Sequence, residues 1–178
     1  MNTDRSSENF MVHDIMMLRP EYNRANFILI DRGILCDHNT KVTVHPCNWD
    51  GCMMHIAVEH KQVCKHLQQH HGLNTTSPTS DDMQQTTCLW TACLGAHMKL
   101  ENLPRHMLLS HLGVRWICST CGGSLSREDA FRRHALERPG CQYAKPVVKY
   151  GDGSLVIDNS VVLDGGWSAS QKVRVTVM

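Results

Sequence analysis

Apolar residues occur along this chain in short, separated runs, and each run predicts one small element. Phe27–Ile30 is followed by Asp31-Arg32-Gly33, which predicts a short strand and then a turn. Val42 and Val44 alternate with polar residues and predict a second strand. Residues 58–70 contain neither proline nor glycine and are compatible with a helix. Because no run is long, the pattern favours several small units over one large core.

The apolar pattern changes again near the C-terminal end. Asp152-Gly153 lies between apolar runs, as in many hairpin turns. Three further stretches have the composition of strands: Leu155–Ile157, Val161–Leu163 and Val173–Val177. Two interpretations stay open for residues 146–178, a flexible tail with transient β-structure and a small ordered β-element.

Two other segments are predominantly polar. Residues 73–87 are dominated by Ser, Thr, Asp and Gln, which predicts a linker without an ordered core. Residues 1–44 form an N-terminal segment that we expect to be partly flexible. It starts with a polar stretch that has no apolar signal-peptide core, and no stretch of the chain is long enough to span a membrane. We therefore expect no membrane partner.

Cysteine and histidine are the outliers of the composition, with nine and twelve residues among 178. An odd number of cysteines without a secretory signal argues against a disulfide framework. A reducing compartment with metal-bound thiolates is the simpler interpretation.

The strongest metal-binding pattern lies in residues 114–145. Two cysteines with two residues between them are followed by a histidine and a third cysteine at ligand spacing: Cys118, Cys121, His134 and Cys141. Leu125 and Phe131 stand where a small ββα unit needs its two apolar anchors. Cys118 and Cys121 alone would also fit a redox pair, but the two later ligands make a zinc site the better interpretation.

Residues 88–113 match a Cys₂His₂ zinc site in the spacing of their four ligands: Cys88, Cys93, His106 and His111. Residues 45–72 have the same four-residue gap between Cys47 and Cys52, followed by His66. Three neighbouring histidines leave the fourth ligand open. We favour His71, because the second module has the same longer spacing, with His70 as the alternative.

Each of these modules is too small to fold on its own core, since chains below about 40 residues usually need a metal or a disulfide. The predicted fold is therefore small zinc-stabilised α+β modules, namely three ββα-type fingers with irregular or weakly β terminal segments. Three zinc ions in closed, four-ligand sites would be structural. The sequence has no recognisable nucleophilic triad or phosphate-binding glycine loop, so we do not expect an enzyme.

Both Cys-x-Trp-x-x-Cys motifs, with Trp49 after Cys47 and Trp90 after Cys88, carry a further likeness. They resemble the tandem fingers of the Gli and Zic type within the Cys₂His₂ zinc-finger class. The resemblance implies that the two tryptophans pack across the junction and join the fingers into one unit. Such pairs often face proteins rather than bases, which implies a protein partner or a dimer through fingers 1 and 2.

Positive charge is concentrated in the third finger. Residues 114–145 contain six basic and three acidic side chains, whereas the whole chain has a net charge of +1. By similarity to transcription-factor fingers, the base-facing positions are Arg127, Ala130 and Arg133, with Asp129 placed to buttress Arg127. Two arginines at these positions imply a 5′-GNG-3′ triplet. The alternative is a solvated arginine face.

These patterns together predict a nuclear, zinc-dependent protein that binds double-stranded DNA and regulates transcription, mainly through finger 3. One finger reads about 3 bp, so a partner, a dimer or the other fingers must add specificity. The alternative is a zinc-stabilised protein-interaction module without sequence-specific DNA binding, and RNA binding is a third option.

Overall fold

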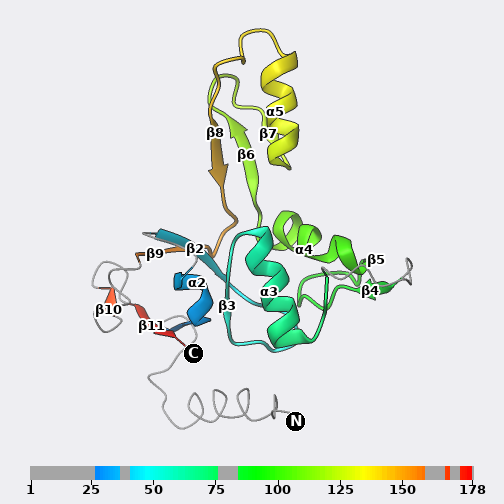
Figure 1. Ribbon diagram of the computed structural model, residues 1–178, viewed down its shortest axis with the longest axis vertical. Helices are drawn as coiled ribbons and strands as arrows, with labels where there is room; N and C mark the ends of the chain where they lie inside the picture. Colours follow the sequence, from blue (N-terminus) through cyan, green and yellow to red (C-terminus); the bar gives the residue numbers. More distant parts are fainter. Residues whose placement is uncertain (1–26, 37–40, 76–83, 159–166, 169–172, 178) are drawn as a thin grey trace. The chain divides into compact units, whose positions relative to one another are not determined.

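The computed structural model describes residues 27–36, 41–75, 84–158, 167–168 and 173–177 (Figure 1). These residues form short strands and short helices, as expected for small α+β modules. None of the helices in these ranges combines the length and the apolar character needed to cross a membrane. Contacts between residues divide the chain into two compact units, of which the first comprises residues 1–57, 89–95 and 155–178 and the second residues 58–88 and 96–154.

The first unit contains a mixed sheet of three strands. Strand β1 (Phe27–Ile30) pairs in parallel with β11 (Val173–Val177), and β11 pairs in antiparallel with β10 (Trp167–Ser168). The strand predicted at 27–30 is therefore confirmed. The turn predicted after it is a short helix instead, α2 (Arg32–Cys36), which starts with a hydrogen bond of 3.0 Å from the Ile34 amide to the Asp31 carbonyl.

A second antiparallel sheet of this unit has the strand order β3-β2-β9. Its strands are β2 (Lys41–Pro46), β3 (His55–Ala57) and β9 (Leu155–Asp158). Together with β1 and α2, this sheet encloses a core of buried aliphatic side chains: Ile28, Ile30, Ile34, Val42, Val44, Ala57 and Ile157. The alternation at Val42 and Val44 thus marks the inward face of β2, as a half-buried strand requires.

The described strands β8 (Pro146–Lys149), β9 and β11 of the C-terminal segment each pair with a strand far away in the sequence. Leu155–Ile157 lies in β9, which pairs with β2, whereas Val161–Leu163 lies outside the described residues. The hairpin predicted at Asp152-Gly153 is wrong. The strands on its two sides, β8 and β9, belong to different sheets, because each pairs with a strand far away in the sequence.

The second unit contains the longest helix of the described residues, α3 (His60–His71). Val63, His66 and Leu67 are buried on one face of this helix, which is the periodicity of an amphipathic helix. Gly72 ends the helix in the left-handed conformation, with φ 69°, and the Leu73 amide donates to the Leu67 carbonyl at 3.0 Å. The helix predicted over 58–70 is confirmed with a shift of its ends.

The next elements of this unit are short. Strand β4 (Gln85–Thr87) pairs with β5 (His97–Lys99), and the 3-10 turn η2 (Leu100–Asn102), helix α4 (Leu103–His106) and π-helix η3 (Met107–His111) follow. The last residues of the predicted linker 73–87 are therefore a strand. Their polar side chains are exposed or half-buried, so no apolar pattern marks this strand in the sequence.

A three-stranded antiparallel sheet with the order β7-β6-β8 completes the second unit. Strands β6 (Arg115–Cys118) and β7 (Ser124–Leu125) precede helix α5 (Glu128–Glu137), and Figure 1 shows α5 against one side of the sheet. The core consists of Cys118, Phe131 and Cys141, with Trp116 and Leu125 packed on it. Strand β8 extends this module beyond residue 145, the end that the sequence predicted.

Two glycines let the chain cross itself between η3 and β6. Gly113 has φ 63°, and a Cβ atom there would lie 2.6 Å from the Gly151 Cα atom. The Gly151 amide donates to the Leu112 carbonyl at 2.9 Å. The guanidinium of Arg115 adds hydrogen bonds to the Leu109 and Val114 carbonyls. The connector 112–114 is therefore held by the residues that follow β8.

Candidate metal centres

All four ligands predicted for residues 114–145 come together in one cluster: Cys118, Cys121, His134 and Cys141. Cys118 ends β6 and Cys121 follows in a tight turn, in which the Gly122 amide donates to the Cys118 carbonyl at 2.9 Å. His134 projects from α5 and Cys141 follows that helix. The Cys118 and Cys141 Sγ atoms are 3.8 Å apart, and Cys121 Sγ lies 3.4 Å from His134 Nε2.

The backbone of this turn favours thiolates. Hydrogen bonding from the Cys121 backbone amide, in the first place, lowers the pKa of the Cys118 thiol to about 6. The Gly123 amide also lies 3.4 Å from Cys121 Sγ, as a donor to sulfur. Burial raises the pKa of Cys141 to about 11, so this third thiol needs a cation beside it to ionise at neutral pH. The hydrogen bonds of the turn thus favour the thiolate of Cys118.

The second cluster consists of Cys88, Cys93, His106 and His111. The Nε2 atoms of its two histidines are 3.1 Å apart, and His111 Nε2 lies 3.4 Å from Cys88 Sγ. The π-helix η3 explains the spacing of five residues, because its wider turn brings i and i+5 to the same face. Burial lowers the pKa of His111 to about 4 and keeps the imidazole neutral, as a metal ligand must be.

The first cluster consists of Cys47, Cys52, His66 and His71. The fourth member is His71, which the spacing favoured over His70, and its Nε2 atom lies 3.3 Å from His66 Nε2. His71 is the last residue of α3, where the helix ends at Gly72. The ring of His70 also approaches that of His66, with centroids 4.7 Å apart, but its ring nitrogens do not belong to this group of four.

These separations match those of a tetrahedral metal site. Metal–sulfur bonds of about 2.3 Å and metal–nitrogen bonds of about 2.0 Å place two tetrahedral ligands about 3.3–3.8 Å apart. The close ligand pairs fit this range, from 3.1 Å between His106 Nε2 and His111 Nε2 to 3.8 Å between Cys118 Sγ and Cys141 Sγ. In each cluster all four ligand atoms lie within 4.8 Å of one another. The part of the chain that the structure describes therefore contains three Cys/His clusters that fit metal ions with four protein ligands each.

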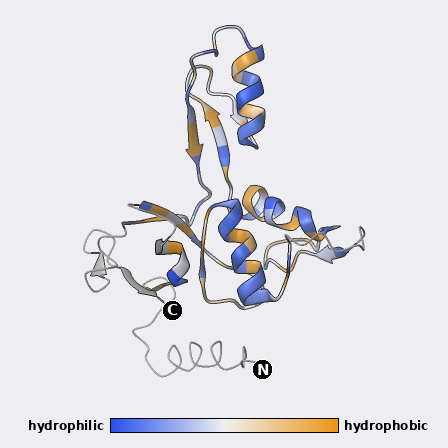
Figure 2. Ribbon diagram, viewed as in Figure 1, coloured by the Kyte–Doolittle hydropathy of each residue, from blue (hydrophilic) through white to orange (hydrophobic). Residues whose placement is uncertain are grey.

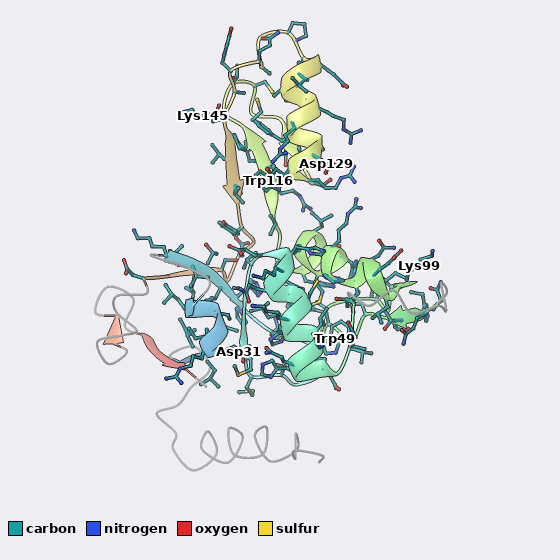
Figure 3. The ribbon with its side chains drawn as sticks, viewed as in Figure 1. Asp31, Trp49, Lys99, Trp116, Asp129 and Lys145 are labelled. Atoms are coloured by element: carbon teal, nitrogen blue, oxygen red, sulfur yellow. The ribbon has the colours of Figure 1, made fainter. Side chains whose placement is uncertain are left out.

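The two tryptophans of the Cys-x-Trp-x-x-Cys motifs meet in the first unit. Trp49 and Trp90 form an antiparallel β-bridge and are only 3% and 5% exposed. The Thr91 amide donates to the Asn48 carbonyl at 2.9 Å, and its hydroxyl donates to the same oxygen at 2.7 Å. The ring of His45 lies 6.1 Å from that of Trp90. The backbones of the two motifs are thus joined directly, and Figure 3 marks Trp49.

The residues predicted to face bases extend from the N-cap of α5 to the middle of this helix. Arg127 precedes the helix in an extended conformation, and its Nε atom lies 3.3 Å from an Asp129 carboxylate oxygen. The other oxygen of Asp129 lies 3.4 Å from Arg133 Nη2. Ala130, which lies between the two arginines in the sequence, is half-buried. Arg132 pairs with Glu128. Asp129 (labelled in Figure 3) therefore pairs with two arginines, one through each carboxylate oxygen.

A cleft of about 700 Å³ lies beside these residues within the second unit. Its charged lining includes Arg105 of α4, Arg127 before α5 and Asp129 of α5, and its apolar lining includes Leu108 and Trp116. Sequence reasoning did not single out Arg105, although it stands one residue before the ligand His106. Its position directly before His106 was the only sequence feature that could have indicated a place near the metal site.

No family model, curated protein or solved structure matches the chain at a significant level.

Proposed function

We propose that this protein is a zinc-dependent DNA-binding protein that regulates transcription in the nucleus. Zinc is the metal whose preferences fit the clusters best, because four thiolate and imidazole ligands in tetrahedral arrangement are typical of structural zinc sites. Four protein ligands would complete a tetrahedral coordination shell at each site and leave no position for a substrate. We therefore assign the metal ions to folding and not to catalysis.

The three modules are, in this proposal, fingers of the Cys₂His₂ class, the third with a final cysteine. The order of their elements supports the assignment: β2, β3 and α3 in the first, β4, β5 and α4 in the second, and β6, β7 and α5 in the third. In each module two ligands come from the strand or turn part and the others from the helix or the residues after it. The bridge between Trp49 and Trp90 supports the likeness to paired Gli-type and Zic-type fingers.

The observation that carries the DNA proposal is the double pairing of Asp129. Its carboxylate holds Arg127 through Nε, which leaves the terminal nitrogens of that guanidinium available for an acceptor pair. Arg133 is held by the same carboxylate. An arginine oriented in this way can donate two hydrogen bonds to O6 and N7 of guanine. With the small Ala130 between them, the expected triplet is 5′-GNG-3′.

Binding of the zinc-loaded full chain to a duplex library tests this function. Each bidentate contact is worth about 1–3 kcal/mol, so Arg127→Ala with Arg133→Ala should weaken binding to 5′-GNG-3′ duplexes by at least tenfold. Arg132→Ala is the matched control, because this arginine pairs with Glu128 on the same helix and stands outside the predicted reading positions. Equal affinity of the double variant and the wild type, or an affinity independent of salt, would refute base reading by α5.

A second candidate function is a protein-interaction module without sequence-specific DNA binding. Its supporting observation is the apolar surface of the second module, where Leu89 is 53% exposed and Leu94 is fully exposed. Exposed leucines beside a structural metal site are suited to a protein partner or a dimer through the first two modules. Sedimentation of the full chain, with Leu94→Ser as the variant, tests for a dimer, and single-stranded RNA in the DNA assay tests the third option.

A further inference from the structure

Strand β8 forms an open edge of the sheet in the third module. Its only strand partner among the described residues is β6, and β7 lies on the far side of β6. Figure 1 shows that α5 covers one side of this sheet and does not run along β8. Figure 2 shows β8 as a largely hydrophobic strand, and Val147 is 49% exposed. An exposed edge strand of this kind is a template for pairing with another chain.

The register defines which backbone groups of β8 are available. The Ser119 amide donates to the Lys145 carbonyl at 3.1 Å. The backbone groups of Lys145 therefore point toward the chain of β6. In an antiparallel ladder this orientation recurs every second residue, and Val147 and Lys149 therefore also bond to β6. The amide and carbonyl of Val148 then point away from the sheet. Pro146 fits this register, because it occupies an outward position where no amide is needed.

The side chains beside this edge form a stripe of one charge sign. Lys145, Val147 and Lys149 are spaced by two residues and lie on the same face, opposite the face on which Trp116 and Cys118 pack against α5. Both lysines are exposed, and Figure 3 shows Lys145 at the margin of the module. Residues 114–127 and 138–151 contain no aspartate or glutamate. The acidic side chains of the module are on α5, where Glu128 and Asp129 pair with arginines.

We propose that the outer edge of β8 binds an extended acidic segment of a partner protein, which adds to the sheet as a fourth strand. The partner's backbone would exchange hydrogen bonds with Val148. Its side chains on the exposed face would be acidic beside Lys145 and Lys149 and aliphatic beside Val147, since opposite charges and aliphatic pairs stabilise neighbouring strands.

This occupant explains more of the surface than the two obvious alternatives. A nucleic-acid backbone would neutralise the lysines, but it would leave Val147 and the outward amide of Val148 without a matching group. A second copy of this chain, paired edge to edge, would bring four lysines together and would be destabilised by their repulsion. The docking edge is independent of base reading by α5, because none of its residues belongs to the predicted reading positions.

Amide hydrogen exchange and peptide binding on the zinc-loaded full chain test the proposal together. The probe is a fluorescent peptide with alternating acidic and aliphatic residues on one face, Gly-Asp-Thr-Val-Thr-Asp-Gly. In the free protein the Val148 amide should exchange fast while those of Val147 and Lys149 are protected, and the peptide should slow exchange at Val148 by at least tenfold. Lys145→Glu with Lys149→Glu should weaken the peptide's affinity at least tenfold, and Val148→Pro should abolish binding.

Three controls make the outcome decisive. Lys99→Glu changes an exposed lysine of another strand and should leave the affinity unchanged. A peptide with lysine in place of aspartate, and one with N-methylated threonines, should not bind. The charge variant keeps the test valid if the proline variant loses its metal. Absent binding at millimolar peptide, equal binding of the acidic and basic peptides, protection of Val148 by a duplex alone, or protection that depends on protein concentration would each overturn the proposal.

Discussion

The first two metal-binding modules share a junction, whereas the third builds its core from its own neighbourhood. Trp49 of the first module and Trp90 of the second are bridged through their backbones and are both buried. In the third module Trp116 of β6 instead packs on the core that contains Phe131. Strand β8 follows the last ligand, Cys141, after a short turn and pairs with β6. A tryptophan is too large for one such module to bury, so it needs either a partner module or an additional strand.

This difference determines which surfaces remain for binding. The first two modules each use a tryptophan for their junction. Their net charge is close to zero. The third module keeps its helix, with Arg127 and Arg133, and its strand edge at β8 open. The same metal chemistry therefore supports two different roles, a joined unit and a module with two exposed surfaces.

The largest effect is expected from removing one ligand of the third module. Cys118→Ser should release one of three metal ions and unfold residues 114–149, because structural zinc contributes about 10 kcal/mol or more to the folding of such modules. Metal analysis and amide exchange measure the result, and the first two modules should stay protected. Cys64→Ser, which changes a buried cysteine outside the three clusters, should keep all three ions. Unfolding of the whole chain by Cys118→Ser would contradict the independence of the third module.

His71→Ala should have the next largest effect. It tests whether His71 or His70 is the fourth ligand of the first cluster. Loss of a ligand should lower metal affinity by more than the roughly 10–100-fold that removal of an outer-shell group costs. His70→Ala is the matched control and should retain three metal ions, because His70 stands outside the cluster of four. Competition with a metal indicator measures both, and the reverse result would assign the fourth ligand to His70.

Trp49→Ala should destabilise the first and second modules together by about 3–5 kcal/mol, the usual cost of deleting a buried large aromatic side chain. Amide exchange in α3 and in α4 should rise in parallel. Trp116→Ala is the comparison and should raise exchange in the third module only. If α3 and α4 respond separately to Trp49→Ala, the junction does not couple the two modules.

Gly113→Ala should destabilise the connector before β6 by about 2–4 kcal/mol. The new alanine would have to keep the left-handed backbone conformation of Gly113. Its Cβ atom would also lie 2.6 Å from the Gly151 Cα atom. Gly122→Ala has the same backbone conformation, with φ 71°, and open space around it, so it isolates the conformational cost of about 1–2 kcal/mol. Equal unfolding midpoints of the two variants would show that the crossing of residues 113 and 151 is loose.

The smallest effect is expected from Arg132→Ala, which removes an exposed ion pair with Glu128 one helical turn away. Such pairs contribute about 0.3–0.5 kcal/mol and are screened by salt. Thermal unfolding of the zinc-loaded chain should therefore change little at low salt and not at all at high salt. A larger loss would mean that α5 depends on this pair for its helical structure.

Sequence spacing was sufficient to predict the metal centres because the ligands of each are close together in the chain. Cys88, Cys93, His106 and His111 lie within one short segment, and a chain of that length has few ways to bring them together around an ion. The helix of residues 58–70 and the strand Phe27–Ile30 were predicted for the same reason, since each depends on its own local pattern.

Strand pairing was predicted poorly because it depends on residues far apart. Gln85–Thr87 looks like a linker until β5 lies beside it, and Asp152-Gly153 looks like a hairpin turn although its two strands pair elsewhere. The side chains of β4 are polar and those of β8 are mostly exposed, so neither strand carries the alternation that marks a buried face.

The sequence by itself determined which cysteines and histidines form the three clusters, and it located the arginines at and after residue 127. Only the tertiary structure decided that β9 completes the sheet of β2 and β3, that β8 completes the sheet of β6 and that Asp129 holds two arginines. The physical reason is the range of the interactions. Ligand geometry and helix periodicity act over a few residues, whereas a strand is stabilised by whichever distant backbone offers it hydrogen bonds and a buried face.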